Sequence, residues 1–249
     1  MLVIVLPLIY FGGHWFVGLM LVATVIATWE MIAMHDKLFN VPMWVKVLLL
    51  ISTLGIALIP DLLMALSVLG ATIFLMITCY VLKKITAETG IFYIKTLIYI
   101  GFSFRALLEI RGHSLRLFIF LIAIVILTDS AAYFAGRLFG KRKLAPKISP
   151  KKTVEGAIGG WLAGAGFAIG FGLMNHLFTE RWILIVLAIG LPILSQVGDL
   201  VASSMKRKYG IKDYGKLFPG HGGVMDRVDS QLLAAVLIYG IIQMGGVLS

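Results

Sequence analysis

Charged residues are scarce in this sequence. Only 14% of its 249 residues are Asp, Glu, Lys or Arg and 60% are hydrophobic, whereas a soluble domain carries about 25% charged residues. A water-soluble protein this apolar could not cover its surface, so lipid must be the solvent for most of the chain. Because no stretch is long enough for a separate soluble domain, we expect one membrane domain over 1–249.

Cysteine and metal-binding clusters are also lacking. The single cysteine, Cys79, lies inside an apolar run and can form no intramolecular disulfide. His and Cys are not clustered as zinc requires, and the stretch GRLFGKR at 136–142 lacks the spacing and final hydroxyl of a Walker loop. Residues 1–10 contain neither a basic leader nor a small-residue cleavage site, so no cleavable signal peptide is expected.

Long apolar runs, by contrast, fill most of the chain. Crossing a bilayer takes about 20 apolar residues in a helix. The runs do not alternate apolar and polar residues as the strands of a membrane β-barrel do. They lie at about 2–12, 14–34, 43–59, 61–82, 91–110, 115–136, 154–174, 181–205 and 230–248. The sequence therefore predicts an all-α polytopic membrane protein with about nine transmembrane helices.

The basic residues indicate how these helices are oriented. With nine spans, 18 of the 22 basic residues fall in or beside the loops of one side, near 35–42, 83–90, 137–153 and 206–229. Basic loops face the cytoplasm, which predicts a multi-pass protein of the cell inner (cytoplasmic) membrane, with its N-terminus cytoplasmic and its C-terminus outside. The arginines around 105–116 are discordant, and a re-entrant or interfacial helix there would account for them.

Two of the predicted cytoplasmic loops, about 137–153 and 206–229, are more basic than orientation requires. The stretch 136–153 holds seven basic residues, and the stretch 205–229 holds six. Such density suits anionic lipid headgroups or a polyphosphate, and charge alone does not choose between them. We expect the active site at this cytoplasmic interface.

The few acidic residues gather near the same loops. Six of the twelve do so: Asp129, Glu155, Asp199, Asp213, Asp226 and Asp229. A charge at the centre of a span costs about 2.5–3.5 kcal/mol, so such a residue persists when it faces a cavity, a partner or an ion. For Asp129 an ion pair with a nearby cation, or interfacial placement, is the alternative. Asp199 and Asp226 offer the oxygen ligands that magnesium takes beside phosphate.

Two short segments have the composition of anion sites. The segment ISPKKT offers Ser149, Lys151, Lys152 and Thr153. It precedes a helix expected to start near Glu155, and helix N-termini bind anions; ordinary capping by Thr153 is the alternative. In PGHGG, at 219–223, glycines let backbone N–H groups approach phosphate closely. Within it His221 can donate a hydrogen bond to phosphate or act as a general acid, although a lone histidine is usually structural.

Glycine is unevenly distributed in one apolar run. Gly156, Gly160 and Gly164 repeat every fourth residue and share one helix face, which predicts close helix packing through small residues. Such a stripe also permits a homodimer without requiring one. A nucleotide fingerprint at Gly164, Gly166 and Gly170 is rejected, because its spacing is wrong and it lies inside a span.

The stretch 203–230 closely resembles the signature of the bacterial phosphatidate cytidylyltransferases. That pattern runs Ser, Lys-Arg, Lys-Asp, His-Gly-Gly, Asp-Arg and a final Asp. The matching positions are Ser203, Lys206, Arg207, Lys212, Asp213, His221, Gly222, Gly223, Asp226, Arg227 and Asp229. The segments SPKKTVEG and QVGDL also resemble the family, so the resemblance covers roughly 125–230.

The resemblance implies transfer of a cytidylyl group from CTP to phosphatidate, giving CDP-diacylglycerol and pyrophosphate in phospholipid biosynthesis. It implies a Mg²⁺ site with Asp199 and Asp226 as ligands, which we extend to Asp129, and allows a monovalent cation such as K⁺ beside it. The catalytic set is Asp199, Asp226, Lys206, Arg207 and His221. The substrate-binding set is Ser149, Lys151, Lys152, Thr153, Ser203, Lys212, Asp213, Gly222, Gly223, Arg227 and Asp229. The expected partners are CTP, phosphatidate and membrane lipid, with no nucleic acid.

Two other functions are compatible with parts of this pattern. A CDP-alcohol phosphotransferase would also use clustered aspartates and magnesium, but in a longer pattern that DRVD at 226–229 only partly echoes. An anion transporter would carry its polar residues at mid-membrane depth along a path. The polar residues here cluster at one face, which favours the cytidylyltransferase.

Overall fold

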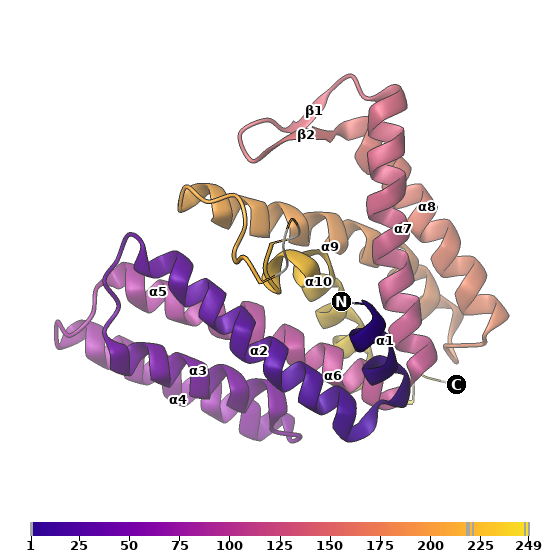
Figure 1. The fold of residues 1–249 in the computed structure, drawn as a ribbon. Helices are drawn as coiled ribbons and strands as arrows, with labels where there is room; N and C mark the ends of the chain where they lie inside the picture. Colours follow the sequence, from indigo (N-terminus) through magenta and orange to yellow (C-terminus); the bar gives the residue numbers. More distant parts are fainter. Residues whose placement is uncertain (1, 218–219, 221, 247, 249) are drawn as a thin grey trace. The chain divides into compact units, whose positions relative to one another are not determined.

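The computed structural model describes residues 2–217, 220, 222–246 and 248, so His221 lies outside the described residues. Most of the described chain is helical, and two short strands pair into a hairpin (Figure 1). The elements are α1 (Leu2–Phe11), α2 (Gly13–Asp36), α3 (Met43–Leu58), α4 (Leu62–Val81), α5 (Ala87–Thr96), the π-helix η1 (Leu97–Phe102), α6 (Ser103–His113), α7 (Leu115–Phe139), β1 (Lys143–Ala145), β2 (Ser149–Thr153), α8 (Val154–Met174), α9 (Arg181–Lys208) and α10 (Met225–Gln243).

The described helices confirm an all-α, multi-pass membrane protein. Six helical segments of the described chain are long and apolar enough to cross a membrane: Gly13–Asp36, Leu62–Val81, Ala87–His113, Leu115–Phe139, Val154–Met174 and Arg181–Lys208. The helix α3 is apolar but has only 16 residues. The helix α10 begins at Met225, before the run expected at 230–248, and so includes Asp226 and Asp229.

The basic loop expected at 137–153 contains regular structure. The helix α7 continues to Phe139, and β1 pairs antiparallel with β2 in the register Lys143 with Thr153. The Glu155 carboxylate accepts hydrogen bonds from the backbone N–H groups of Lys141 and Arg142, which ties the start of the hairpin to α8. The hairpin therefore gives the SPKKT segment a defined backbone.

The described chain divides into two compact units. One contains 1–108 and 213–227, and the other contains 109–212 and 228–249. In the first, α2, α3 and α4 pack side by side and α5 and η1 pack on them (Figure 1). In the second, α7, α8 and α9 pack together and β2 contacts α8. We call these the N-terminal unit and the C-terminal unit, and the expectation of one domain over 1–249 stays a prediction.

The glycine stripe on α8 packs as expected, within the C-terminal unit. Gly156, Gly160 and Gly164 are buried. A β-carbon on Gly156 would lie 2.6 Å from the carbonyl oxygen of Ala132 on α7, and one on Gly160 would lie 2.6 Å from that of Thr128. These close approaches confirm that small residues allow α7 and α8 to pack along their lengths.

Arg105 is accounted for within the N-terminal unit. Its side chain is only 2% exposed, and its guanidinium donates hydrogen bonds to the carbonyls of Ile59 and Pro60. These carbonyls follow the end of α3, where helix C=O groups lack partners and a positive charge is favoured. Arg105 belongs to the continuous helical segment Ala87–His113, and a re-entrant or interfacial helix around 105–116 stays a prediction.

We expect Arg105→Ala to lower the free energy of unfolding by about 3 kcal/mol, because hydrogen bonds from a charged donor to buried carbonyls are lost. The effect is measured by thermal unfolding in detergent. Arg116→Ala is the control: Arg116 has an exposed side chain at the start of α7, and its replacement should change stability by no more than about 0.5 kcal/mol. Equal melting temperatures for the two variants would contradict a stabilising role of Arg105.

Candidate functional site

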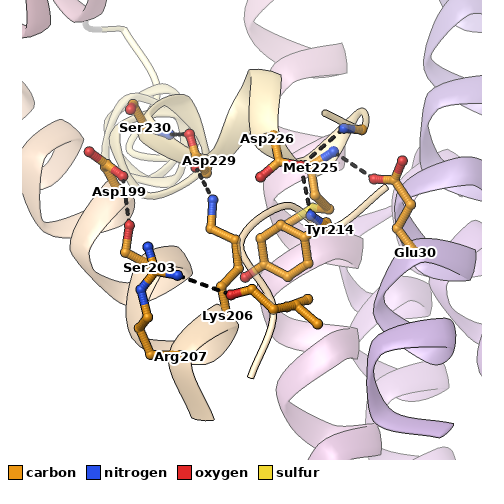
Figure 2. Close-up of polar contacts among 12 residues, drawn as sticks. Glu30, Asp199, Ser203, Lys206, Arg207, Tyr214, Met225, Asp226, Asp229 and Ser230 are labelled. Atoms are coloured by element: carbon orange, nitrogen blue, oxygen red, sulfur yellow. Dashed lines mark hydrogen bonds and ion pairs between the residues drawn. The ribbon is translucent and has the colours of Figure 1, made fainter. Parts of the chain in front are cut away.

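Four elements bring charged and hydroxyl side chains of the C-terminal unit together, and these come from α7, the SPKKT segment, QVGDL and parts of the 203–230 stretch. They are Asp129 on α7, Lys152 on β2, the residues Asp199, Ser203 and Lys206 on α9, and Asp229 and Ser230 on α10. Figure 2 shows the part of this cluster on α9 and α10. Residues separated by 100 positions in the sequence therefore form one polar cluster, which we call the aspartate–lysine cluster.

Lys152 is the cation at one side of the aspartate–lysine cluster. Its ammonium nitrogen lies 2.5 Å from Oδ2 of Asp199, and both side chains are about one-quarter exposed. Oδ1 of Asp199 accepts a hydrogen bond of 3.2 Å from the Ser203 hydroxyl, one turn along α9. Asp129 lies within electrostatic range of Lys152 and Asp199, and its side chain is hydrogen-bonded to Ser230. The alternative of an ion-paired Asp129 stays a prediction.

Lys206 is the second cation of the cluster. Its ammonium nitrogen lies 3.8 Å from Oδ2 of Asp229, and both side chains are nearly buried. Oδ1 of Asp229 accepts a hydrogen bond from the backbone N–H of Ser230. This part of α10 lies against α9 because Gly198 has no side chain: a β-carbon there would lie 2.8 Å from the carbonyl oxygen of Asp229. The glycine of QVGDL therefore sets the spacing beside Asp199.

Arg207 joins the hairpin to the end of α9. Its Nε donates to the carbonyl of Ile148, and another guanidinium nitrogen donates to the carbonyl of Ile211. Arg207, which the sequence predicts as a catalytic cation, therefore binds backbone carbonyls in this structure. The neighbouring Tyr209 is partly buried, and this burial raises the pKa of its phenol.

Thr153 is the N-cap of α8. Its hydroxyl oxygen accepts a hydrogen bond of 3.1 Å from the backbone N–H of Gly156, and the residue is buried. The capping alternative is therefore what the structure shows, since helix N-termini leave N–H groups that a threonine hydroxyl satisfies. A substrate contact through Thr153 stays a prediction. Strand β2 also carries Ser149, which is partly buried, and Lys151, which is exposed.

In the N-terminal unit, Asp226 organises the segment that leads into α10. Its Oδ2 accepts hydrogen bonds from the backbone N–H groups of Tyr214, at 2.8 Å, and Gly223, at 3.0 Å. Gly222 has a φ of 81°, which favours glycine, and a β-carbon there would lie 2.6 Å from Oδ2 of Asp226. The Gly223 N–H that the sequence assigned to phosphate thus binds a carboxylate of the chain itself.

Some predicted residues lie on the surface. The side chains of Lys212, Asp213 and Arg227 are exposed. Their assignment to substrate binding stays a prediction, as does that of the glycines at 222 and 223.

Glu30 on α2 was missed in the sequence. It is 6% exposed and accepts hydrogen bonds from the backbone N–H of Val224, at 3.0 Å, and from that of Met225, at 2.9 Å. Figure 2 shows the bond to Met225. Its signal was available, because a carboxylate inside an apolar run is costly and so usually has a partner. Ser230 was also omitted, although it directly follows the last aspartate of the signature.

The described carboxylates fit magnesium in donor type. Within the part of the chain that the structure describes, no three His, Cys, Asp or Glu side chains are grouped so as to hold a metal ion. Mg²⁺, however, commonly takes one or two carboxylates and fills its remaining positions with water and substrate phosphate. Asp129 and Asp199 offer such oxygens in the C-terminal unit, whereas Asp226 belongs to the N-terminal unit. The ligand set stays a prediction.

Comparisons of this chain with known proteins agree on one family. A model described as the cytidylyltransferase family matches residues 1–244. A phosphatidate cytidylyltransferase of Staphylococcus haemolyticus is 34% identical over 246 residues, covering 95% of this chain and 93% of that protein.

Two further relatives match over a shorter stretch. A phosphatidate cytidylyltransferase of Staphylococcus epidermidis is 42% identical over 147 residues, which cover 59% of this chain and 56% of that protein. One of Brucella suis is 48% identical over 149 residues, covering 57% and 54%. In these alignments the chain spans about half the length of the curated relatives it matches. Together with the match to the family model over nearly its whole length, these similarities show that the chain belongs to the cytidylyltransferase family.

Proposed function

We propose that the protein transfers the cytidylyl group of CTP to phosphatidate, releasing pyrophosphate and forming CDP-diacylglycerol for phospholipid biosynthesis. The observation that carries this proposal is the aspartate–lysine cluster, in which the family's motif residues meet within one unit. Relatives named for this reaction support it. Family membership also disfavours a CDP-alcohol phosphotransferase or an anion transporter.

The reaction forms one phosphorus–oxygen bond and breaks another. A phosphate oxygen of phosphatidate attacks the α-phosphorus of CTP, and the bond to the bridging oxygen breaks, so that pyrophosphate leaves with the electron pair. Because the phosphate monoester is already largely ionised at pH 7, the attack needs no general base. The main obstacle is repulsion between two anions, and cations positioned in advance reduce it.

Lys152 and Lys206 are the cations that we assign to this task. Each is held by an aspartate, Asp199 or Asp229, so its position is set before substrate arrives. We propose that phosphate oxygens compete with the carboxylate for Lys152, whose side chain is the more exposed of the two lysines. Mg²⁺, when bound, would stabilise charge on the transferring group. We propose Asp199, Asp226 and Asp129 as its ligands, and K⁺ as a second cation.

The membrane topology follows from the same proposal. One substrate is a lipid and the other is a soluble nucleotide, so the site belongs at the cytoplasmic interface of the inner membrane. We propose nine spans with the N-terminus cytoplasmic and the C-terminus outside, on the strength of the basic loops.

The proposal is tested with purified protein in detergent, CTP labelled in the cytosine ring, phosphatidate and Mg²⁺. We expect label in CDP-diacylglycerol, and none when Mg²⁺ is chelated or phosphatidate is omitted. Omitting K⁺ tests whether the reaction needs the proposed second cation. If folded protein transfers no label to lipid, the cytidylyltransferase function is wrong. Label in lipid that survives chelation would instead contradict the metal requirement alone.

A further inference from the structure

The carboxylate of Glu30 is seated at the start of α10. Glu30 lies on α2, yet Oε1 accepts the N–H of Val224 and Oε2 accepts that of Met225. The first N–H groups of a helix have no partner within the helix, and a negative charge is favoured there. A residue 194 positions away in sequence therefore supplies what a helix usually receives from its own N-cap.

Two carboxylates divide the N–H groups of this turn between them. Oδ2 of Asp226 accepts the N–H of Gly223, and Glu30 accepts the next two. Both anions bind the backbone immediately before Asp226, and Met225, which Glu30 holds, is its direct neighbour. The position of the Asp226 carboxylate therefore depends on Glu30 through a short run of fixed backbone.

Two glycines make room for Glu30. A β-carbon on Gly223 would overlap the Glu30 carboxylate, with Oε2 at 2.5 Å, and a β-carbon on Gly215 would lie 2.8 Å from its Cδ. Gly223 has no positive φ, so alanine is excluded there by this carboxylate rather than by backbone conformation. One glycine of the family signature is thus explained by an acidic residue outside the signature.

We propose that Glu30 is a positioning residue, which holds the first turn of α10 so that Asp226 is placed for the reaction. This inference rests on the function proposed above. It assigns Glu30 no contact with substrate, and its effect should appear in kcat and in the Mg²⁺ requirement.

The first test compares Glu30→Gln with Asp36→Asn. Glutamine keeps the size of Glu30 but replaces one accepting oxygen with an NH₂ group. This group cannot accept a hydrogen bond from the backbone N–H that it faces. A misplacement of about 1 Å can reduce turnover about 100-fold, so we expect a loss of that order in kcat. The Mg²⁺ concentration for half-maximal rate should rise, while KM for phosphatidate stays unchanged. Asp36, also on α2, binds the N–H of Val41 and the ammonium of Lys46, so Asp36→Asn should keep wild-type kinetics.

The second test is a double-mutant cycle between Glu30→Ala and Gly223→Ala. Each single change should lower kcat, the first by freeing the turn and the second by displacing the carboxylate. In Glu30→Ala the obstacle to a β-carbon at 223 is gone, so the double variant should be no slower than Glu30→Ala. Losses that multiply would show that the two positions act independently and would overturn the proposal.

Hydrogen exchange gives a readout that does not depend on activity. In Glu30→Gln we expect faster exchange in peptides covering 213–227, with α3 and α4 unchanged. Faster exchange throughout the chain would make Glu30 a residue of general stability and overturn the positioning role. If wild type makes CDP-diacylglycerol and Glu30→Gln equals it, this inference is wrong while the proposed function stands. If wild type makes none, the proposed function itself is wrong.

Discussion

Asp199→Asn is expected to reduce the transfer of label from CTP to lipid by about 1,000-fold, the range found when a group that stabilises the transition state is removed. Asp199 is the centre of the aspartate–lysine cluster, with Lys152 at one carboxylate oxygen and Ser203 at the other. An amide keeps the shape but cannot balance the ammonium of Lys152, and it is a poorer ligand for a cation.

The neighbours of Asp199 make this prediction specific. Ser203→Ala removes one hydrogen bond and leaves the charge, so we expect a loss of only about tenfold, corresponding to about 1.4 kcal/mol. Asp36→Asn again serves as the control, because it removes a comparable ion pair, to Lys46, on the same chain. Initial rates at saturating CTP, on protein that is monodisperse in detergent, provide the measurement. Activity of Asp199→Asn within tenfold of wild type would remove Asp199 from the catalytic set.

Much of the fold follows from local sequence. Each apolar run contains a helix, because a backbone in lipid must satisfy its own hydrogen bonds. The four-residue spacing of Gly156, Gly160 and Gly164 predicted the face of α8 that packs closely, because that spacing depends only on helix geometry. Helix ends were harder to place: α7 and α9 run beyond their apolar stretches to Phe139 and Lys208, since polar residues can continue a helix outside lipid.

Contacts between residues that lie far apart in the sequence could not be predicted from local patterns. The sequence placed Lys152 and Asp199 in one predicted site, but the ion pair between them depends on how the hairpin meets α9. For Thr153 the sequence offered capping beside a role in anion binding, and its 3.1 Å hydrogen bond with Gly156 shows the cap, which depends on local geometry alone. Glu30 stood out only as a carboxylate inside an apolar run, and its place at α10 could not be predicted, because its partners are backbone N–H groups, which carry no mark in the sequence.

The packing of α7 on α8 also has a consequence for the site. Gly160 contacts the backbone at Thr128, and the next residue on α7 is Asp129. The hairpin that carries Lys152 leads directly into α8. The distance between the two helices therefore sets the distance between Asp129 and Lys152, so a wider helix pair should impair the cluster as well as the fold.

Gly160→Val is accordingly expected to destabilise the protein by about 3 kcal/mol, at the upper end of the cost of overpacking. Its β-carbon would lie 2.6 Å from the carbonyl oxygen of Thr128 and 2.8 Å from Cβ of Ala132, and neither α7 backbone nor an alanine methyl can rotate away. For a chain of this size the loss corresponds to a fall in Tm of about 10 °C.

The same helix provides the control for this substitution. Gly166 and Gly170 also lie on α8, but a β-carbon on either would have nothing within 4 Å. Gly166→Val and Gly170→Val should therefore melt within about 2 °C of wild type, as surface substitutions do. If all three valine variants lose stability equally, valine is tolerated poorly anywhere in α8. Close packing against α7 would then not be what requires glycine at 160.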